Sequence, residues 1–311
     1  MVPLVAALGA DVTVTGRGRL PERPLLPLLK ALDQNGSKSF ESKSKYLPLN
    51  QLHRIRPRAF EIPGGGSSQY TTGMLMALPA LEPAEADSSR IKLDSPLVSR
   101  EYVDMTLEVL SLYGITVYEE QDGFTVPAGQ KYQKPEKLKL ERDWSCAAFW
   151  IAMDFLGSEV EVADLPLGSH QPDRHVSELL GRDQIDITGC PDLFPTLAVV
   201  ASARGETEFI GTERLRLKES DRVQSTRELV QKFGAEFRED GDSVTIIGHP
   251  KSGKLHYSGE PVETFNDHRI AMAAAVAATI SDSKVTIREA ARVVRKSYPV
   301  YFQQLMKMEI L

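Results

Sequence analysis

Two segments of the chain, residues 105–129 and 226–248, share one pattern of apolar residues and glycines. Each begins with an amphipathic helical pattern that stops at a glycine, Gly114 in the first segment and Gly234 in the second. Two short runs of alternating apolar residues follow, joined by an Asp-Gly turn, which is typical of a β-hairpin. A third, degraded copy covers residues 24–49. Repeated helix–strand–strand units predict an α/β protein built by internal duplication.

A second recurring feature is a helical segment that is apolar on nearly all sides and begins with one to four polar residues, here called a polar box. Helices without a polar face are buried inside their domain. Ser, Asp or Asn at the start of such a helix caps it, and the free N–H groups at that end attract anions. For any single box a simple N-cap is the better explanation, but several helix starts that converge on one cleft would bind anions. The four boxes are Ser67-Ser68-Gln69, Asp143-Trp144-Ser145, Asp192 and Asn266-Asp267-His268-Arg269.

Length and charge narrow the possible classes of protein. The chain has 311 residues, with 37 Lys and Arg against 43 Asp and Glu, a formal net charge of -6. At roughly 150 residues per domain, this length predicts two domains. We expect an N-terminal domain over residues 1–139 and a C-terminal domain over 140–311, because Pro135 and alternating charges separate the two repeat series. The mild acidity offers no basic surface for nucleic acid or a membrane, so neither partner is expected.

Cysteine usage and apolar runs exclude further classes. The only cysteines, Cys146 and Cys190, lack CxxC or Cys/His spacing, so neither a disulfide framework nor a zinc site organises the fold. The longest apolar run, residues 271–280, is half the length that a membrane span requires. The start at Met1-Val2-Pro3 has no basic region, which disfavours a secretory signal and predicts a cytoplasmic protein.

The densest group of charges covers residues 214–222. Arg214, Arg216 and Lys218 alternate with leucines, so a strand here would present three cations on one face, and a helix would begin at Glu219. One interpretation is a solvated edge strand. The other is a clamp for phosphate or carboxylate groups, with Glu219 able to move protons. Neighbouring cations would lower the pKa of Glu219 and burial would raise it, and the sequence leaves this choice open.

Further cations gather in three places. Arg269 stands at the start of an apolar helix, where the helix dipole disfavours a cation, so either a bound anion or a surface pair with Asp267 must offset the repulsion. The other groups are Arg292, Arg295 and Lys296 near the C-terminus and Arg17, Arg19 and Arg23 near the N-terminus. Together these cations predict a site for a substrate with two anionic groups.

The motifs around these residues resemble the 5-enolpyruvylshikimate-3-phosphate (EPSP) synthase family, the 3-phosphoshikimate 1-carboxyvinyltransferases. They occur in the family's order and extend from Arg19 to Pro299. The matching motifs are Leu20-Pro21-Glu22-Arg23-Pro24, Ser67-Ser68-Gln69-Tyr70, Ser99-Arg100-Glu101-Tyr102-Val103-Asp104, Gly129-Gln130-Lys131-Tyr132, Pro191-Asp192, Arg216-Leu217-Lys218-Glu219-Ser220-Asp221-Arg222, Asp267-His268-Arg269-Ile270-Ala271-Met272 and Lys296-Ser297-Tyr298-Pro299.

The resemblance implies a two-domain, inside-out α/β barrel of repeated βαβαββ units, with helices inside a shell of sheet and the active site in the cleft between domains. It implies transfer of the enolpyruvyl group of phosphoenolpyruvate to the 5-hydroxyl of shikimate 3-phosphate, with release of phosphate. This reaction belongs to the shikimate pathway, which supplies chorismate and the aromatic amino acids. The two small-molecule substrates are the implied partners; no metal or other cofactor is expected, and a complete member is expected to be a monomer.

The resemblance also implies roles for individual residues. Asp192 would accept the hydroxyl proton, and Glu219 would exchange a proton with the enol carbon. His268 would act in support of these groups. Shikimate 3-phosphate would be held by Ser67, Ser68, Gln69, Ser99, Tyr102 and Lys218. Phosphoenolpyruvate would be held by Arg23, Gln69, Arg222, Arg269 and Lys296.

The chain departs from the family pattern at its start. Family members carry a sizeable segment before the equivalent of residue 4, so the first domain is expected to be incomplete. The alternative function is therefore a truncated, catalytically incompetent fragment that only binds anions. Gly36-Ser37-Lys38-Ser39 matches a substrate-binding tetrapeptide of that segment but lies elsewhere in the order, so we assign it no role. A sister enolpyruvyl transferase for a UDP-amino sugar is disfavoured, because neither cysteine lies in the reactive loop of that enzyme.

Overall fold

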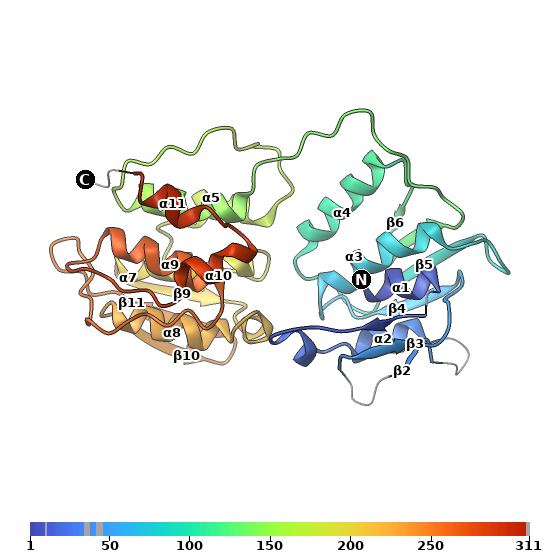
Figure 1. The fold of residues 1–311 in the computed structure, drawn as a ribbon, viewed down its shortest axis with the longest axis horizontal. Coiled ribbons are helices and arrows are strands. Elements are labelled where there is room, and N and C mark those ends of the chain that lie inside the picture. Colours follow the sequence, from blue (N-terminus) through green and yellow to red (C-terminus); the bar gives the residue numbers. More distant parts are fainter. Residues whose placement is uncertain (10, 34–37, 42–45, 309–311) are drawn as a thin grey trace. The chain divides into compact units, whose positions relative to one another are not determined.

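The computed structural model describes residues 1–9, 11–33, 38–41 and 46–308. The chain divides into two compact units, Met1–Leu140 and Glu141–Leu311 (Figure 1). Each unit has its own buried apolar core and its own four-stranded sheet.

The main sheet of the first unit has the strand order β4-β5-β7-β6, and only the β4–β5 pair is parallel. One helix follows β4 and another follows β5, so the segment reads βαβαββ. The elements in chain order are β4 (Ala59–Ile62), α3 (Ser68–Ala77), β5 (Ser88–Leu93), α4 (Arg100–Leu112), β6 (Tyr118–Glu120) and β7 (Gly123–Pro127).

The sheet of the second unit repeats this topology. Its order is β8-β9-β11-β10, with a parallel β8–β9 pair and antiparallel partners beyond it. The elements are β8 (Gln184–Asp186), α7 (Phe194–Ser202), β9 (Glu206–Ile210), α8 (Arg222–Lys232), β10 (Glu236–Asp240) and β11 (Ser243–Ile247). Both predicted helix–hairpin repeats and the predicted α/β class with βαβαββ units are therefore confirmed.

The degraded third repeat also folds as a helix followed by two paired strands. In the smaller sheet, of order β1-β3-β2, β3 pairs antiparallel with both neighbours. Its order of elements matches the last five elements of the complete unit. They are α1 (Val2–Leu8), β1 (Thr13–Val14), α2 (Leu26–Leu32), β2 (Phe40–Glu41) and β3 (Leu49–Gln51). Gly36 and Ser37 of the tetrapeptide lie outside the described residues.

The four segments predicted as buried helices are helices: α3, α5 (Trp144–Phe155), α7 and α9 (His268–Thr279). In the second unit, one face of α7 packs on the sheet through Phe194 and Phe209, whose rings meet edge to face at 5.2 Å. The opposite face, with Val199 and Val200, packs against α9. A helix enclosed on both sides cannot carry a polar face, which explains its uniformly apolar sequence.

Three of the four predicted caps form. Ser67, Asp143 and Asp267 each accept a hydrogen bond from a backbone N–H in the first turn of the helix that follows. The prediction is wrong for Asp192, which lies inside a short 3₁₀ helix, η4 (Pro191–Leu193), and makes no side-chain cap. Its carboxylate is therefore available for other partners.

Two other local predictions need correction. Residues 213–217 form a 3₁₀ helix, η5 (Glu213–Leu217), instead of a strand, so the three cations do not share one strand face. The helix after it begins at Arg222 and is capped by Asp221, so Glu219 precedes the helix. The alternation of leucines with cations is as compatible with a 3₁₀ helix as with a strand, because Leu215 is the only leucine of this segment that is buried.

The remaining helices are short and connect the larger elements. They are α6 (Val176–Leu179), α10 (Ala290–Val293), α11 (Tyr301–Leu305), η1 (Leu20–Glu22), η2 (Leu78–Ala80), η3 (Pro172–His175) and η6 (Val294–Lys296). No helix in the described part of the chain is both long and apolar enough to cross a membrane.

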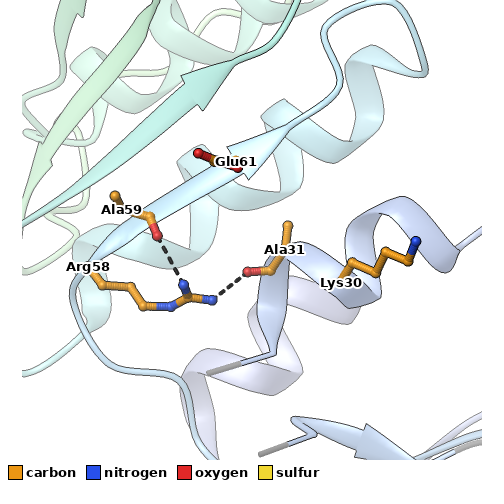
Figure 2. A pocket seen from close by; sticks show the side chains of 5 residues that line it. All are labelled: Lys30, Ala31, Arg58, Ala59 and Glu61. Atoms are coloured by element: carbon orange, nitrogen blue, oxygen red, sulfur yellow. Dashed lines mark hydrogen bonds between the residues drawn. The ribbon is translucent and has the colours of Figure 1, made fainter. Parts of the chain in front are cut away.

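A hollow of about 330 Å³ lies beside α2 in the first unit, lined by Lys30, Ala31, Arg58, Ala59 and Glu61 (Figure 2). Arg58 donates hydrogen bonds to the backbone oxygens of Ala31 at 2.7 Å and Ala59 at 3.1 Å. Its guanidinium thus satisfies one carbonyl group at the C-terminal end of α2 and one at the start of β4, which is a structural role. The hollow contains no residue predicted for the site.

Candidate active site

In the second unit, two parallel strands direct their carboxyl ends to one edge of the sheet. The chain leaves β8 toward η4, which carries Asp192, and leaves β9 toward η5 and the start of α8, which carries Arg222. Ligands of α/β sheets bind at such edges, where adjacent strands end and helices begin. The topology therefore brings together residues that are far apart in the sequence.

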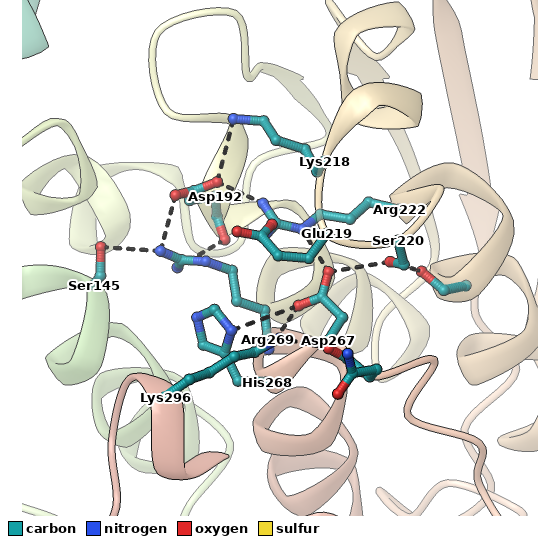
Figure 3. Close-up of polar contacts among 12 residues, drawn as sticks. Ser145, Asp192, Lys218, Glu219, Ser220, Arg222, Asp267, His268, Arg269 and Lys296 are labelled. Carbon is teal, nitrogen blue, oxygen red and sulfur yellow. Dashed lines mark hydrogen bonds and ion pairs between the residues drawn. The ribbon is translucent and has the colours of Figure 1, made fainter. Parts of the chain in front are cut away.

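Arg222 lies at the centre of a cluster of carboxylates (Figure 3). Its Nε donates to Asp267 Oδ2 at 3.0 Å, its Nη2 to Glu219 Oε2 at 2.6 Å, and its Nη1 to Asp192 Oδ1 at 2.5 Å. The Arg222 side chain is 1% exposed. Burial opposes its charge, but these three carboxylates raise its pKa above the ordinary arginine value. A buried guanidinium with three charged acceptors is fixed in position.

Asp192 faces three cations. Besides Arg222, its Oδ2 accepts a hydrogen bond from Arg269 Nη2 at 2.8 Å, and Lys218 Nζ lies 3.5 Å from its Oδ1. Burial by itself would raise the pKa of Asp192, but Arg269, Arg222 and Lys218 together hold that pKa far below the usual range. In this state Asp192 is an ionised carboxylate and a weak base.

Asp267 is fully buried and organises the start of α9. Its Oδ1 caps the helix through the N–H of Arg269, while its Oδ2 accepts from Ser220 and Arg222 at 3.0 Å each. Burial opposes the charge of Asp267, but Arg222 keeps its pKa below the usual value. The predicted alternative of an Asp267–Arg269 surface pair is wrong, because both side chains are buried and Asp267 pairs with Arg222.

Arg269 extends from α9 toward Asp192 on one side and α5 on the other (Figure 3). Its Nη1 donates to the backbone oxygen of Asp192 at 3.3 Å, and its Nη2 lies 3.4 Å from Ser145 Oγ. Asp173, on η3, is a further carboxylate at 3.7 Å from Nη1. The repulsion between this cation and the helix dipole is thus offset by protein carboxylates.

Lys218, His268 and Lys296 border the cluster. Burial lowers the pKa of Lys218, although Asp192 opposes that shift. Burial and then Arg269 lower the pKa of His268 to about 4, so its imidazole is neutral near pH 7. Within the described part of the chain, its buried Nδ1 has no hydrogen-bond partner. Lys296 donates a hydrogen bond from its ammonium group to the backbone oxygen of Asn266 at 2.5 Å.

Phe265 and Asn266 both adopt positive φ, at 50° and 54°, directly before α9. Such backbone costs about 1–3 kcal/mol per residue and is concentrated at functional sites.

The second unit therefore brings together six predicted site residues: Asp192, Lys218, Glu219, Arg222, His268 and Arg269. Lys296 joins them through Asn266, next to Asp267. Sequence reasoning missed Asp173 and did not assign Ser145 or Asp267 a place in the site. Asp267 and Ser145 stood within recognised polar boxes, but Asp173 carried no signal beyond a Pro-Asp step before a short helix.

The first unit has the equivalent sheet edge, where β4 leads to α3 and β5 leads to α4. The two connecting loops are joined by hydrogen bonds from Gly64 N to Asp94 Oδ1 at 3.2 Å and from Val98 N to Gly64 O at 3.1 Å. Gly64 lets the two loops approach each other closely, since a Cβ there would lie 1.9 Å from Ser95 O.

Five of the predicted residues of the first unit lie at the starts of these two helices. Ser67 caps α3, Ser68 is buried behind it, and Gln69 follows in the first turn. Ser99 precedes α4 with a positive φ of 51°, and the N–H of Tyr102 donates to its carbonyl at 3.2 Å. All five thus lie at the loops that the Gly64 contacts join.

Arg23 belongs to the same unit. Tyr70, on α3, donates its hydroxyl to the carbonyl of Pro24 at 2.5 Å, which connects the segment carrying Arg23 to the start of that helix. The cations predicted for phosphoenolpyruvate are therefore divided between the units, with Arg23 in the first and the other three in the second.

Within the described ranges, no group of three or more His, Cys, Asp or Glu side chains is arranged to hold a metal ion. Cys146 is half-buried and donates to Asp143 at 3.2 Å; burial and Asp143 raise the pKa of its thiol to about 12. A thiol that stays protonated is a poor nucleophile.

Comparison with known proteins agrees with this geometry. The family model described as EPSP synthase (3-phosphoshikimate 1-carboxyvinyltransferase) matches residues 1–183 and 174–305. A 3-phosphoshikimate 1-carboxyvinyltransferase of Clostridium kluyveri is 34% identical over 99% of this chain and 75% of its own length. One of Methanocorpusculum labreanum is 34% identical over 98% of this chain and 75% of its own length.

Solved structures show the same fold. The EPSP synthase of Acinetobacter baumannii superposes with a TM-score of 0.75 at 21% identity, covering 99% of this chain and 77% of that one. The enolpyruvyl transferase NikO from Streptomyces tendae superposes with a TM-score of 0.67 at 16% identity. The family match spans nearly the whole chain and the curated relatives exceed 30% identity, so this protein belongs to the EPSP synthase family.

Proposed function

We propose that this chain catalyses enolpyruvyl transfer from phosphoenolpyruvate to the 5-hydroxyl of shikimate 3-phosphate. The enolpyruvyl carbon that carries the phosphate forms a bond to the 5-oxygen of shikimate 3-phosphate. The bond between that carbon and the phosphate oxygen breaks, and the hydroxyl proton leaves with phosphate. The observation that carries the proposal is Asp192, a carboxylate surrounded by Lys218, Arg222 and Arg269 at the carboxyl edge of a parallel strand pair. The family membership supplies the reaction that this cluster fits.

The proposed roles follow the two halves of the reaction. Arg222, Arg269 and Lys296, with Arg23 and Gln69 of the first unit, would hold the phosphate and carboxylate of phosphoenolpyruvate. Each charge-assisted hydrogen bond contributes about 1.5–3 kcal/mol. Shikimate 3-phosphate would be held by Ser67, Ser68, Gln69, Ser99, Tyr102 and Lys218.

The ion pairs of the cluster explain how Asp192 could act as a base. In the present arrangement, Arg222 and Arg269 both donate to its carboxylate and suppress its basicity. An anionic substrate that drew these guanidinium groups toward itself would weaken both contacts and raise the pKa of Asp192. Binding of phosphoenolpyruvate would therefore prepare Asp192 to accept the hydroxyl proton. Glu219, held by Arg222 at 2.6 Å, would exchange a proton with the enol carbon.

The proposed reaction needs no metal or organic cofactor, because the cations of the protein supply the charge stabilisation. We further propose that the chain acts in the cytoplasm, in the pathway that leads through chorismate to the aromatic amino acids. A neutral His268 beside Asp267 would support the carboxylate network without adding charge.

The test is phosphate release by the purified protein, given phosphoenolpyruvate with and without shikimate 3-phosphate. We expect release that requires both substrates and falls by about 10²–10⁴ in Asp192→Ala. Asp183→Asn, an exposed carboxylate just before β8, is the matched control and should retain full activity. A folded wild-type protein that binds phosphoenolpyruvate but releases no phosphate would contradict the proposal and favour the anion-binding alternative.

A further inference from the structure

Asp173 is a buried carboxylate that the proposed reaction does not use. It lies on η3, its side chain is 2% exposed, and its Oδ1 has no hydrogen-bond partner among the residues that the structure describes. Its Oδ2 accepts a hydrogen bond from Ser145 Oγ and lies 3.7 Å from Arg269 Nη1. A buried carboxylate with one unpaired oxygen is costly, so a role that offsets this cost is expected.

The contacts of Asp173 complete the support of Arg269. Asp192 contacts one side of the guanidinium through Oδ2 at 2.8 Å and its backbone oxygen at 3.3 Å. Ser145 Oγ lies 3.4 Å from Nη2 and Asp173 Oδ2 lies 3.7 Å from Nη1, so each terminal nitrogen has a second neighbour besides Asp192. Because guanidinium is planar and recognises anions through a rigid fork, contacts at both terminal nitrogens fix the orientation of its plane.

We propose that Asp173, acting through Ser145, is a positioning residue that orients Arg269 toward the anionic substrate and adjusts the net charge around that guanidinium. This inference rests on the proposed function, in which Arg269 holds phosphoenolpyruvate. If the substrate drew Arg269 away from Asp192, Ser145 and Asp173 would still support the guanidinium.

The charged groups around Asp173 determine how its protonation state affects the binding of an anion to Arg269. It is faced by Arg269 on α9, by Asp192 on η4, and by Asp143 and Cys146 at the start of α5. Burial raises the pKa of Asp173 to about 6; Arg269 opposes this shift, and Asp192 adds to it. An anion that binds Arg269 brings more negative charge and favours the protonated form. Substrate binding should therefore be accompanied by proton uptake near pH 6, and should weaken as Asp173 ionises.

The experiment compares steady-state kinetics of the wild type with Asp173→Ala, Asp173→Asn and Ser145→Ala. At pH 5, where Asp173 is protonated in the wild type, we expect the KM for phosphoenolpyruvate to rise about tenfold in Asp173→Ala and Ser145→Ala, with the KM for shikimate 3-phosphate unchanged. Asn keeps the shape and hydrogen-bonding capacity of Asp without its charge. Asp173→Asn should therefore have the same KM for phosphoenolpyruvate as the wild type at pH 5. Between pH 5 and 7.5 its KM should rise less than that of the wild type. The titration of phosphoenolpyruvate itself affects both proteins equally and does not alter this comparison.

Glu178→Gln, an exposed carboxylate on α6 that pairs with His175, is the control and should match the wild type. Thermal unfolding of each variant checks that it folds, and Asp173→Asn remains informative if the alanine variants do not. An unchanged KM for phosphoenolpyruvate in both alanine variants, equal rises in both KM values, or a wild-type pH dependence in Asp173→Asn would each overturn the inference. A wild type without turnover would instead overturn the proposed function, and this inference with it.

Discussion

Arg222 Nε lies 3.0 Å from Asp267 Oδ2, and both side chains are almost completely buried, with 1% and 0% of their surfaces exposed. The pair joins the start of α8 to the start of α9. Asp267 also caps α9 through Arg269 N, so one carboxylate positions two of the cations proposed to bind substrate.

The first prediction concerns this pair. Asp267→Asn keeps a residue that can cap α9 but leaves Arg222 without one of its buried charged partners. We expect the free energy of unfolding to fall by about 3 kcal/mol, because breaking a buried ion pair leaves an uncompensated charge. Urea denaturation measures the change. The matched control is Asp143→Asn, an exposed cap of α5, which should cost less than about 1 kcal/mol. Because Asn can cap a helix in both variants, equal losses would show that the buried charge of Asp267 does not stabilise the fold.

The second prediction concerns pH. Burial holds the pKa of His268 at about 4, whereas the unfolded side chain titrates near 6.5. Between these values the unfolded chain binds a proton that the folded protein does not, so the free energy of unfolding decreases as the pH falls from 6.5 toward 4. His268→Gln removes this proton uptake. Denaturation at pH 7.5 and pH 4.5 should show that the wild type loses on the order of 2 kcal/mol more than the variant. Identical pH dependence in both proteins would contradict the assigned burial of His268.

The third prediction concerns the joined loops of the first unit. A Cβ at Gly64 would lie 1.9 Å from Ser95 O, a backbone atom that cannot move without moving its loop. Gly64→Ala should therefore destabilise the protein by about 2–3 kcal/mol. Gly65→Ala is a close control, because its Cβ would meet only the Ser95 hydroxyl at 3.5 Å. Thermal unfolding of the two variants makes the comparison, and a Gly64→Ala protein as stable as Gly65→Ala would refute the close approach.

The fourth prediction concerns Glu239 on β10, which accepts hydrogen bonds from Arg216 at 2.5 Å and from Arg227. The Arg216 contact connects η5, which leads directly to Lys218 and Glu219, to β10, and the Arg227 contact connects α8 to the same strand. Glu239→Gln should lower the rate of phosphate release about tenfold, because small displacements of catalytic groups are costly, while changing stability by less than about 1 kcal/mol. Glu236→Gln, on the same strand, pairs with Arg238 and is the control. Full activity in Glu239→Gln would mean that η5 needs no such support.

Much of the fold was predictable from the sequence because its signals are local. Gly114 and Gly234 end helices with positive φ, the Asp-Gly steps turn between β-strands, and the uniformly apolar segments are buried helices. Ser67, Asp143 and Asp267 cap helices through contacts with residues two or three positions away. Such interactions depend only on neighbouring residues, so the pattern of the sequence carries them.

The tertiary structure decided which charges meet. Arg222 and Asp267 are 45 positions apart, and Arg269 and Ser145 are 124 apart, so no spacing rule connects either pair. Asp192 looked like another helix cap, but the turn of η4 moves it out of the capping position and into contact with three cations. Asp173 carried no sequence signal beyond a Pro-Asp step, because its properties come from burial and from neighbours on α5, η4 and α9. Sequence alone determined the repeats, the buried helices and the residue types of the site. Their charge balance depends on burial and on distances of a few ångströms, which exist only once the chain has folded.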